Sequence, residues 1–117
     1  WKDKKAMMNH ARLTLEQVHL TDVADKFPHQ LSGGQQQKVA IARAMINSPK
    51  VILADEPTGN LDPESSKEIM NLLSAISKGG TAIIMATHDM EVVKNYPGRV
   101  IKCEEGVITE VQSLINE

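Results

Sequence analysis

The sequence predicts an α/β fold, and three observations indicate it. Two short, uninterrupted apolar runs, "VILA" at 51–54 and "TAIIMAT" at 81–87, are typical of strands buried on both faces. The segment between them, 62–80, carries the start and stop signals of a helix. Strand, helix and strand form a βαβ unit, so we expect parallel strands joined by a right-handed crossover.

Helices are expected before the first strand. Residues 2–18 predict a charged helix with an apolar face made of Met7, Ala11, Leu15 and Val18. A short helix is expected within 20–28, where Pro28 would end it. A further helix follows the glycines of "LSGGQ" and runs to about residue 47, with an apolar face made of Val39, Ala42 and Ile46.

The long helix and the segments after it have clear boundary signals. Asp62 suits the N-cap, Pro63 the first helical position and Gly79 the C-terminal stop. Residues 89–96 predict a short helix, and "RVIKC" and "VITE" predict a hairpin with Gly106 in its turn. One or two helical turns are expected in 111–117.

Composition excludes some function classes. The 117 residues carry a net charge of −2, so no basic surface indicates a nucleic-acid partner. The apolar runs, such as "AIIMA" at 82–86, are far too short for a membrane span. Cys103 is the single cysteine, which excludes an internal disulfide and fits a reducing compartment. The chain begins at Trp1 without an initiator methionine, so we expect a piece of a longer protein.

The stretch "LSGGQ" at 31–35 places two glycines where a helix should begin. Ser32 and Gln35 have the spacing of a capping box, but that motif requires neither glycine. Glycine in a helix costs about 1 kcal/mol relative to alanine. A missing Cβ lets a ligand approach the backbone, and a helix N-terminus favours phosphate. We therefore expect Gly33 and Gly34 to serve phosphate binding, with capping alone as the alternative.

Acidic and imidazole groups follow both predicted strands. Asp55 and Glu56 come after the first strand, and His88 and Asp89 come after the second. The C-terminal ends of parallel strands lie on one edge of the sheet, where ligands bind in open α/β folds. The sequence therefore predicts that these groups converge at a functional edge.

Four motifs in order resemble those of the ABC-type ATPases. "LSGGQ" resembles their signature, "VILADEP" their Walker B strand, "GNLD" their D-loop and "THD" their switch-histidine loop. The resemblance implies the C-terminal part of a P-loop (RecA-like) ATPase core over 31–117. Residues 1–30 would be the end of the family's helical subdomain, so the partial ATP-binding domain covers 1–117.

The resemblance implies a role for each candidate residue. Asp55 would hold Mg²⁺, and Glu56 would polarise the water that attacks ATP. His88 would contact the γ-phosphate. Asp62 has two readings, a local N-cap and a role across a dimer interface, and we expect both. The signature residues Ser32, Gly33, Gly34 and Gln35 would bind the nucleotide held by a partner subunit, and Arg43 would anchor their helix.

The sequence contains no G-x-x-x-x-G-K-[ST] phosphate loop. We therefore expect that the chain alone does not hydrolyse ATP, and that it pairs head to tail with a second ATPase subunit. "LADEPTGNLD" resembles the branch of lipoprotein-release, macrolide-export and cell-division ATPases, and "MATHD" leans toward the cell-division member. That reading implies an FtsX-type membrane partner and a peripheral position on the cytoplasmic face of the inner membrane.

Two other classes are compatible with these motifs. A non-catalytic remnant could pair with an intact ATPase subunit, although it would have no use for Glu56 and His88. The ATPase heads of chromosome-maintenance and DNA-repair proteins also carry a signature and a Walker B strand. "DEPTGNLD" resembles the transporter ATPases far better, and the sequence has no coiled-coil heptads.

Overall fold

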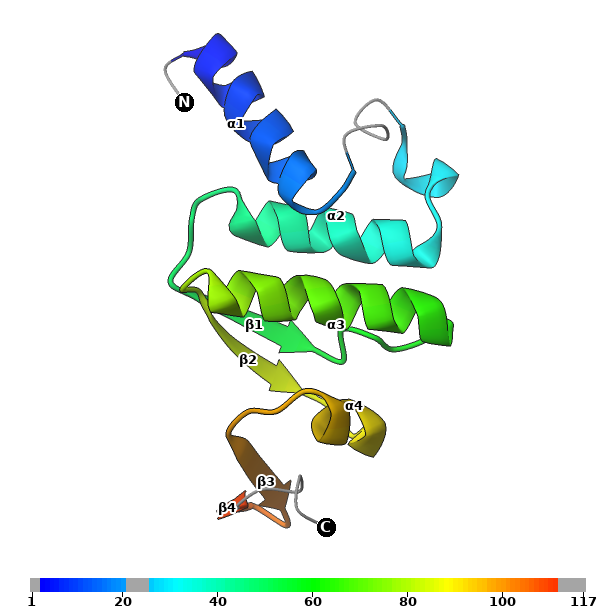
Figure 1. Ribbon diagram of the computed structural model, residues 1–117, viewed down its shortest axis with the longest axis vertical. Helices are drawn as coiled ribbons and strands as arrows, with labels where there is room; N and C mark the ends of the chain where they lie inside the picture. Colours follow the sequence, from blue (N-terminus) through cyan, green and yellow to red (C-terminus); the bar gives the residue numbers. More distant parts are fainter. Residues whose placement is uncertain (1–2, 21–25, 112–117) are drawn as a thin grey trace. The chain divides into compact units, whose positions relative to one another are not determined.

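The computed structural model describes residues 3–20 and 26–111, in two compact units divided between Met85 and Ala86. The first unit contains α1 (Lys4–Gln17), the 3-10 helix η2 (Pro28–Gln30), α2 (Gly33–Met45), β1 (Val51–Asp55), α3 (Pro63–Lys78) and most of β2 (Ala82–Ala86) (Figure 1). The second unit contains α4 (Met90–Asn95), β3 (Val100–Glu104) and β4 (Val107–Val111). The predicted α/β class is confirmed.

β1 and β2 form a two-stranded parallel sheet, and α3 is the crossover between them. The amide of Ala82 donates to the carbonyl of Lys50 at 2.9 Å where the two strands begin. α3 begins and ends as predicted, with Asp62 as its N-cap, Pro63 at its start and Gly79 as its C-cap. The two strands therefore leave the sheet at the same end, as a βαβ unit requires.

The prediction that both strands are buried on both faces is wrong. Ile52 is 6% exposed, whereas Leu53, on the other face of β1, is 78% exposed, and Ile84 of β2 is 62% exposed. A continuous apolar run indicates that burial of both faces of the strand is favourable, but it does not indicate which segment packs against each face. Within the described ranges, one face of this sheet stays open.

α1 and α2 pack together in the first unit. Val18, at the end of the predicted apolar face of α1, is fully buried, and the imidazole Nε2 of His10 is hydrogen-bonded to the carbonyl of Ile46. α2 buries Ile41 and Ala42, whereas Val39, expected on its apolar face, is 36% exposed. α2 contacts both α1 and α3, so its buried surface is not the single stripe that the sequence suggested.

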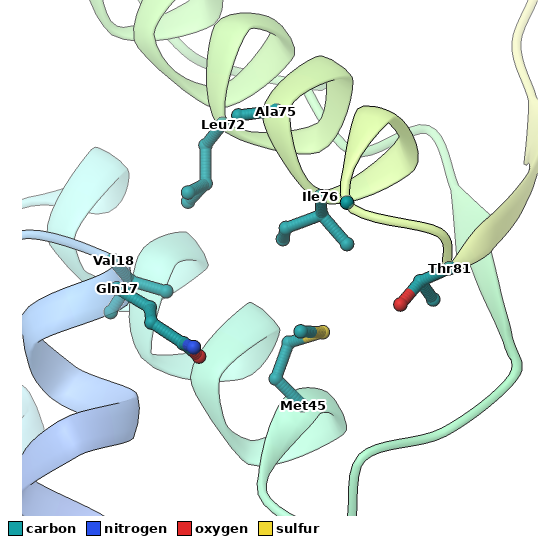
Figure 2. Close-up of a pocket in the computed structure, with 8 residues that line it drawn as sticks. Gln17, Val18, Met45, Leu72, Ala75, Ile76 and Thr81 are labelled. Atoms are coloured by element: carbon teal, nitrogen blue, oxygen red, sulfur yellow. The ribbon is translucent and has the colours of Figure 1, made fainter.

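An apolar cavity of about 300 Å³ lies where the C-terminal ends of α1, α2 and α3 approach one another. Figure 2 shows Met45 and Ile76 pointing into it, with Leu72 above and Gln17 at one side. The lining is mostly aliphatic, and no charged side chain contributes to it. This cavity lies at the opposite end of α2 and α3 from the glycines and Asp62.

The second unit contains the predicted short helix and hairpin. Asp89 is the N-cap of α4 and accepts a hydrogen bond from the amide of Glu91 at 3.0 Å. β3 and β4 are antiparallel, and Glu105 and Gly106 between them have φ of 49° and 76°. Two consecutive positive φ angles are what a tight type I′ hairpin turn requires.

Some sequence predictions fall on other parts of the chain. The helix expected within 20–28 and the helical tail expected in 111–117 lie mostly outside the described residues. None of the helices in the described ranges has the length and hydropathy needed to cross a bilayer.

Candidate functional site

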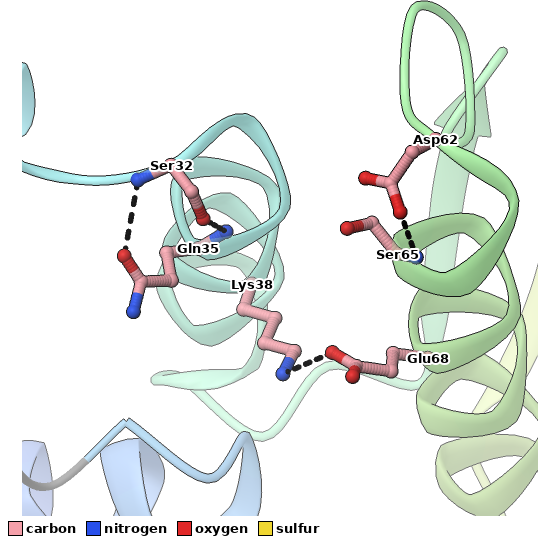
Figure 3. Close-up of polar contacts among 6 residues, drawn as sticks. All are labelled: Ser32, Gln35, Lys38, Asp62, Ser65 and Glu68. Carbon is pink, nitrogen blue, oxygen red and sulfur yellow. Dashed lines mark hydrogen bonds and ion pairs between the residues drawn. The ribbon is translucent and has the colours of Figure 1, made fainter.

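The starts of α2 and α3 lie side by side, and the two helices run in the same direction (Figures 1 and 3). A Cβ added to Gly34 would lie 3.2 Å from the Cβ and the Oγ of Ser65. Further along both helices, Lys38 Nζ and Glu68 Oε2 form an ion pair at 3.0 Å. Residues of α2 thus lie beside residues about thirty positions later in α3, both at Gly34 and Ser65 and at Lys38 and Glu68. A constant offset of this kind is what two helices running in the same direction show. This arrangement brings the signature residues and the start of α3 together.

The first turn of α2 carries the capping box that the sequence predicts. The Ser32 Oγ accepts a hydrogen bond from the amide of Gln35 at 3.1 Å. In return, the Gln35 Oε1 accepts one from the amide of Ser32 at 3.0 Å (Figure 3). This reciprocal pair fixes the direction in which the chain enters the helix. Capping is therefore confirmed for these two residues, and their binding of a nucleotide stays a prediction.

The two signature glycines have different surroundings. Gly33 is exposed, and a Cβ there would meet only the Cδ2 of Leu61, at 3.3 Å. Gly34 is buried, and its added Cβ would meet Ser65 of the neighbouring helix. The structure thus gives Gly34 a packing reason that the sequence did not reveal. This reason is compatible with phosphate binding, because both require a backbone without a side chain.

The loop that leaves β1 holds the candidate catalytic carboxylates. Asp55 is the last residue of β1, and Glu56 follows with a φ of 46°. The amide of Gly59 donates to the carbonyl of Glu56 at 3.0 Å and closes a turn, in which Thr58 is buried. A left-handed backbone is uncommon for a residue other than glycine, costs about 1–3 kcal/mol and clusters at functional sites.

Asp55 extends from the open face of the sheet. Residues two apart on a strand share a face, so Asp55 lies on the same side as the exposed Val51 and Leu53. The described residues contain no group of three or more His, Cys, Asp or Glu that could hold a metal ion by itself. Mg²⁺ is usually held by one or two carboxylates together with phosphates and water. A single exposed carboxylate therefore fits the role predicted for Asp55.

Asp62 is the N-cap of α3, which confirms one of its two predicted roles. Its Oδ2 accepts a hydrogen bond from the amide of Ser65 at 3.1 Å (Figure 3). Hydrogen bonds from the Ser65 side chain, and then from its backbone, hold the pKa of Asp62 below its ordinary value of 3.8. The carboxylate is thus anionic and oriented near neutral pH. Its role across a dimer interface stays a prediction.

His88 follows β2 and is exposed. It belongs to the second unit, whereas Glu56 belongs to the first. The predicted convergence of these two residues at one sheet edge therefore stays a prediction. Within the first unit, the signature residues lie at the start of α2, Asp55 and Glu56 at the end of β1, and Asp62 at the start of α3.

Sequence reasoning missed the residues that join α2 to α3. Ser65 contacts Gly34 and Asp62, and Lys38 pairs with Glu68. The bond of its amide to Asp62 is a local feature, because an N-cap side chain accepts from the backbone N–H two or three positions later. Its contact with Gly34 depends on how two helices pack, which no local pattern gives.

A parallel sheet with a crossover helix and a glycine-led helix define the α/β class to which the P-loop ATPases belong. Residues 2–59 match the family model described as ABC transporter. The solved dimeric structure of the bacterial ABC transporter cassette MJ0796 superposes with a TM-score of 0.75 at 36% identity, over 96% of this chain and 50% of that one. The same cassette was solved in a post-hydrolysis state bound to ADP and Pi.

Relatives of this chain are ATP-binding proteins of the same kind. An uncharacterized ABC transporter ATP-binding protein of Methanocaldococcus jannaschii is 49% identical over 94% of this chain and 49% of its own length. The cell division protein FtsE of Bacillus subtilis is 50% identical over 85% of this chain and 43% of its own. The methionine import protein MetN of Streptococcus mutans is 47% identical over 87% of this chain and 29% of its own.

These matches identify the chain as a member of the ABC-type ATPase family. The chain spans about half the length, or less, of the curated relatives it matches. FtsE and MetN resemble it to nearly the same degree, so the family is established and the cell-division branch stays a prediction.

Proposed function

We propose that this chain is the signature and Walker B part of an ATP-hydrolysing ABC subunit. Glu56 polarises the attacking water, and Asp55 would hold Mg²⁺, whose charge would stabilise the transferred phosphoryl group. His88 contacts the γ-phosphate. The signature residues 32–35 and Asp62 complete the nucleotide site of a second, head-to-tail subunit. Residues 1–30 are the end of the helical subdomain, and 31–117 belong to the ATPase core.

The backbone of Glu56 is the observation that carries this proposal. A left-handed φ of 46° is uncommon for a residue other than glycine and clusters at functional sites, and unlike Glu105 this residue is not in a hairpin turn. Such a conformation persists where the surrounding structure enforces it, and here a closed turn and a buried Thr58 do so. The left-handed backbone turns the chain out of β1 at Glu56, the residue that follows Asp55. The presence of Glu56 and His88 also argues against a non-catalytic remnant, which would have no use for them.

The test is Glu56→Gln in the longer protein that contains this chain. We expect turnover to fall by about 10²–10⁴, as for loss of a general base, with ATP affinity and melting temperature unchanged. Glu105→Gln is the matched control, because Glu105 is also a left-handed glutamate but lies in the hairpin turn. A Glu56→Gln variant that hydrolyses ATP within about tenfold of the parent would contradict the catalytic role.

We further propose that the parent protein is FtsE-like. It would lie on the cytoplasmic face of the membrane and act with an FtsX-type membrane protein. "LADEPTGNLD", "MATHD" and the 50% identity to FtsE of Bacillus subtilis support this. The similarity to MetN makes methionine import the main alternative, and a lipoprotein-release or macrolide-export ATPase is another. Deleting the gene should lengthen or block dividing cells without altering methionine uptake, and the reverse result would favour the import reading.

A further inference from the structure

Ser65 connects two elements of the candidate site. Its side chain lies against the buried Gly34, and its amide donates to the carboxylate of Asp62 at 3.1 Å. We propose that Ser65 is a positioning residue that holds the start of α2 and the carboxylate of Asp62 in one fixed arrangement. The packing part of this inference stands on the structure alone, and its consequence for turnover rests on the proposed function.

The contact at Gly34 leaves little room for adjustment. An added Cβ would lie 3.2 Å from the Ser65 Cβ, which is fixed to the backbone of α3 and cannot rotate away. The start of α2 would then have to move by a few tenths of an ångström relative to α3. At Gly33 the corresponding neighbour is the Cδ2 of Leu61, the far end of a flexible side chain. Two adjacent glycines of one motif should therefore respond differently to the same added methyl group.

Two further contacts hold α2 beside α3 and Ser65 beside Asp62. Lys38, whose side chain is 16% exposed, pairs with Glu68 at 3.0 Å further along α2 and α3. At the start of α3, the amide of Ser65 donates to the Asp62 carboxylate at 3.1 Å. A displacement at Gly34 is therefore transmitted to Ser65 and from there to Asp62.

This link has a functional meaning in the proposed dimer. The signature backbone and Asp62 both belong to the half-site that one subunit presents to the other. Catalytic and binding groups must be held within about 0.5 Å of their productive geometry by residues that support them. Ser65 would supply that support from within the subunit, without touching the nucleotide.

A stability cycle tests the packing part on the 117-residue chain and on the longer protein. Gly34→Ala should lower the melting temperature by about 4 °C or more, and this loss should disappear when Ser65→Gly is also present. Gly33→Ala should not lower it, and Ser66→Gly controls for placing glycine in the first turn of α3. Equal effects of Gly34→Ala with and without Ser65→Gly would overturn the packing link.

A second measurement separates positioning from stability. The pKa of Asp62, followed by carboxyl NMR, should rise toward its ordinary value in Ser65→Ala and stay unchanged in Ser66→Ala. In the longer protein, Ser65→Ala should lower kcat severalfold at unchanged KM for ATP, and Ser65→Thr, which retains the hydroxyl, should restore part of it. An unchanged kcat in Ser65→Ala, while Glu56→Gln is inactive, would overturn the positioning role and leave the proposed function standing. An active Glu56→Gln would overturn the proposed function and leave the packing link standing.

Discussion

The two ends of the α2–α3 pair are built differently. At their N-terminal ends the helices approach so closely that a Cβ on Gly34 would lie only 3.2 Å from Ser65, and polar groups there are capped or paired. At their C-terminal ends an aliphatic cavity of about 300 Å³ lies beside Met45 and Ile76. The signature residues 32–35 and Asp62 lie at the close-packed end. Under the proposed function, the closely packed end presents the candidate half-site, and we expect changes at the cavity end to alter stability rather than turnover.

The largest expected effect on stability lies at the C-terminal end. Leu72 is buried beside the cavity, so Leu72→Ala would enlarge a space that already exists. We expect the free energy of unfolding to fall by about 2–5 kcal/mol, measured by urea denaturation. Leu53→Ala removes the same atoms from an exposed site and should change it by no more than about 0.5 kcal/mol. If each folded Leu72→Ala molecule hydrolysed ATP more slowly than the parent, the proposal that the C-terminal ends of α2 and α3 affect stability alone would be wrong.

A smaller effect of opposite sign is expected at Glu56. Glycine adopts a positive φ without strain, so Glu56→Gly should raise the free energy of unfolding by about 0.5–1 kcal/mol. The same variant should abolish ATP turnover in the longer protein. Glu105→Gly should stabilise the hairpin for the same reason and leave turnover intact. Destabilisation by Glu56→Gly would show that its side-chain contacts outweigh the backbone strain.

The smallest effect is a pH dependence at Asp62. Its pKa is lowered in the folded state, so the unfolded chain binds the proton more readily. The stabilisation is therefore present above about pH 4, the unfolded value, and is lost as the pH falls through the lower folded value. Asp62→Asn should flatten this acid limb of the stability curve, and Ser65→Ala should flatten part of it. A wild-type curve that coincides with that of Asp62→Asn between pH 2 and 5 would contradict this assignment.

Local signals in the sequence predicted the boundaries of the elements well. Asp62, Pro63 and Gly79 delimit α3, and the pair Glu105–Gly106 forms the hairpin turn, because caps and turns depend on residues close in sequence. The capping box of Ser32 and Gln35 is local for the same reason.

Features that depend on tertiary packing escaped prediction. The open face of the β1–β2 sheet could not be foreseen, since an apolar strand does not specify what covers it. The packing role of Gly34 depends on Ser65, some thirty positions away and on another helix. The backbone strain at Glu56 was also not predicted, because left-handed turn positions usually carry glycine, asparagine or aspartate rather than glutamate. Sequence thus identified which residues to consider, and the fold showed how they are held.

The open sheet face has a practical consequence for handling this chain. Val51, Leu53 and Ile84 expose branched apolar side chains, and in the described residues β1 and β2 form a sheet of only two strands. Each strand then has an outer edge whose amides and carbonyls can pair with another molecule. Stored at high concentration, the 117-residue chain should gradually add strands sideways and form thioflavin-binding oligomers. The time for which it stays monomeric in solution will therefore depend on its concentration, even where its melting temperature is well above the storage temperature.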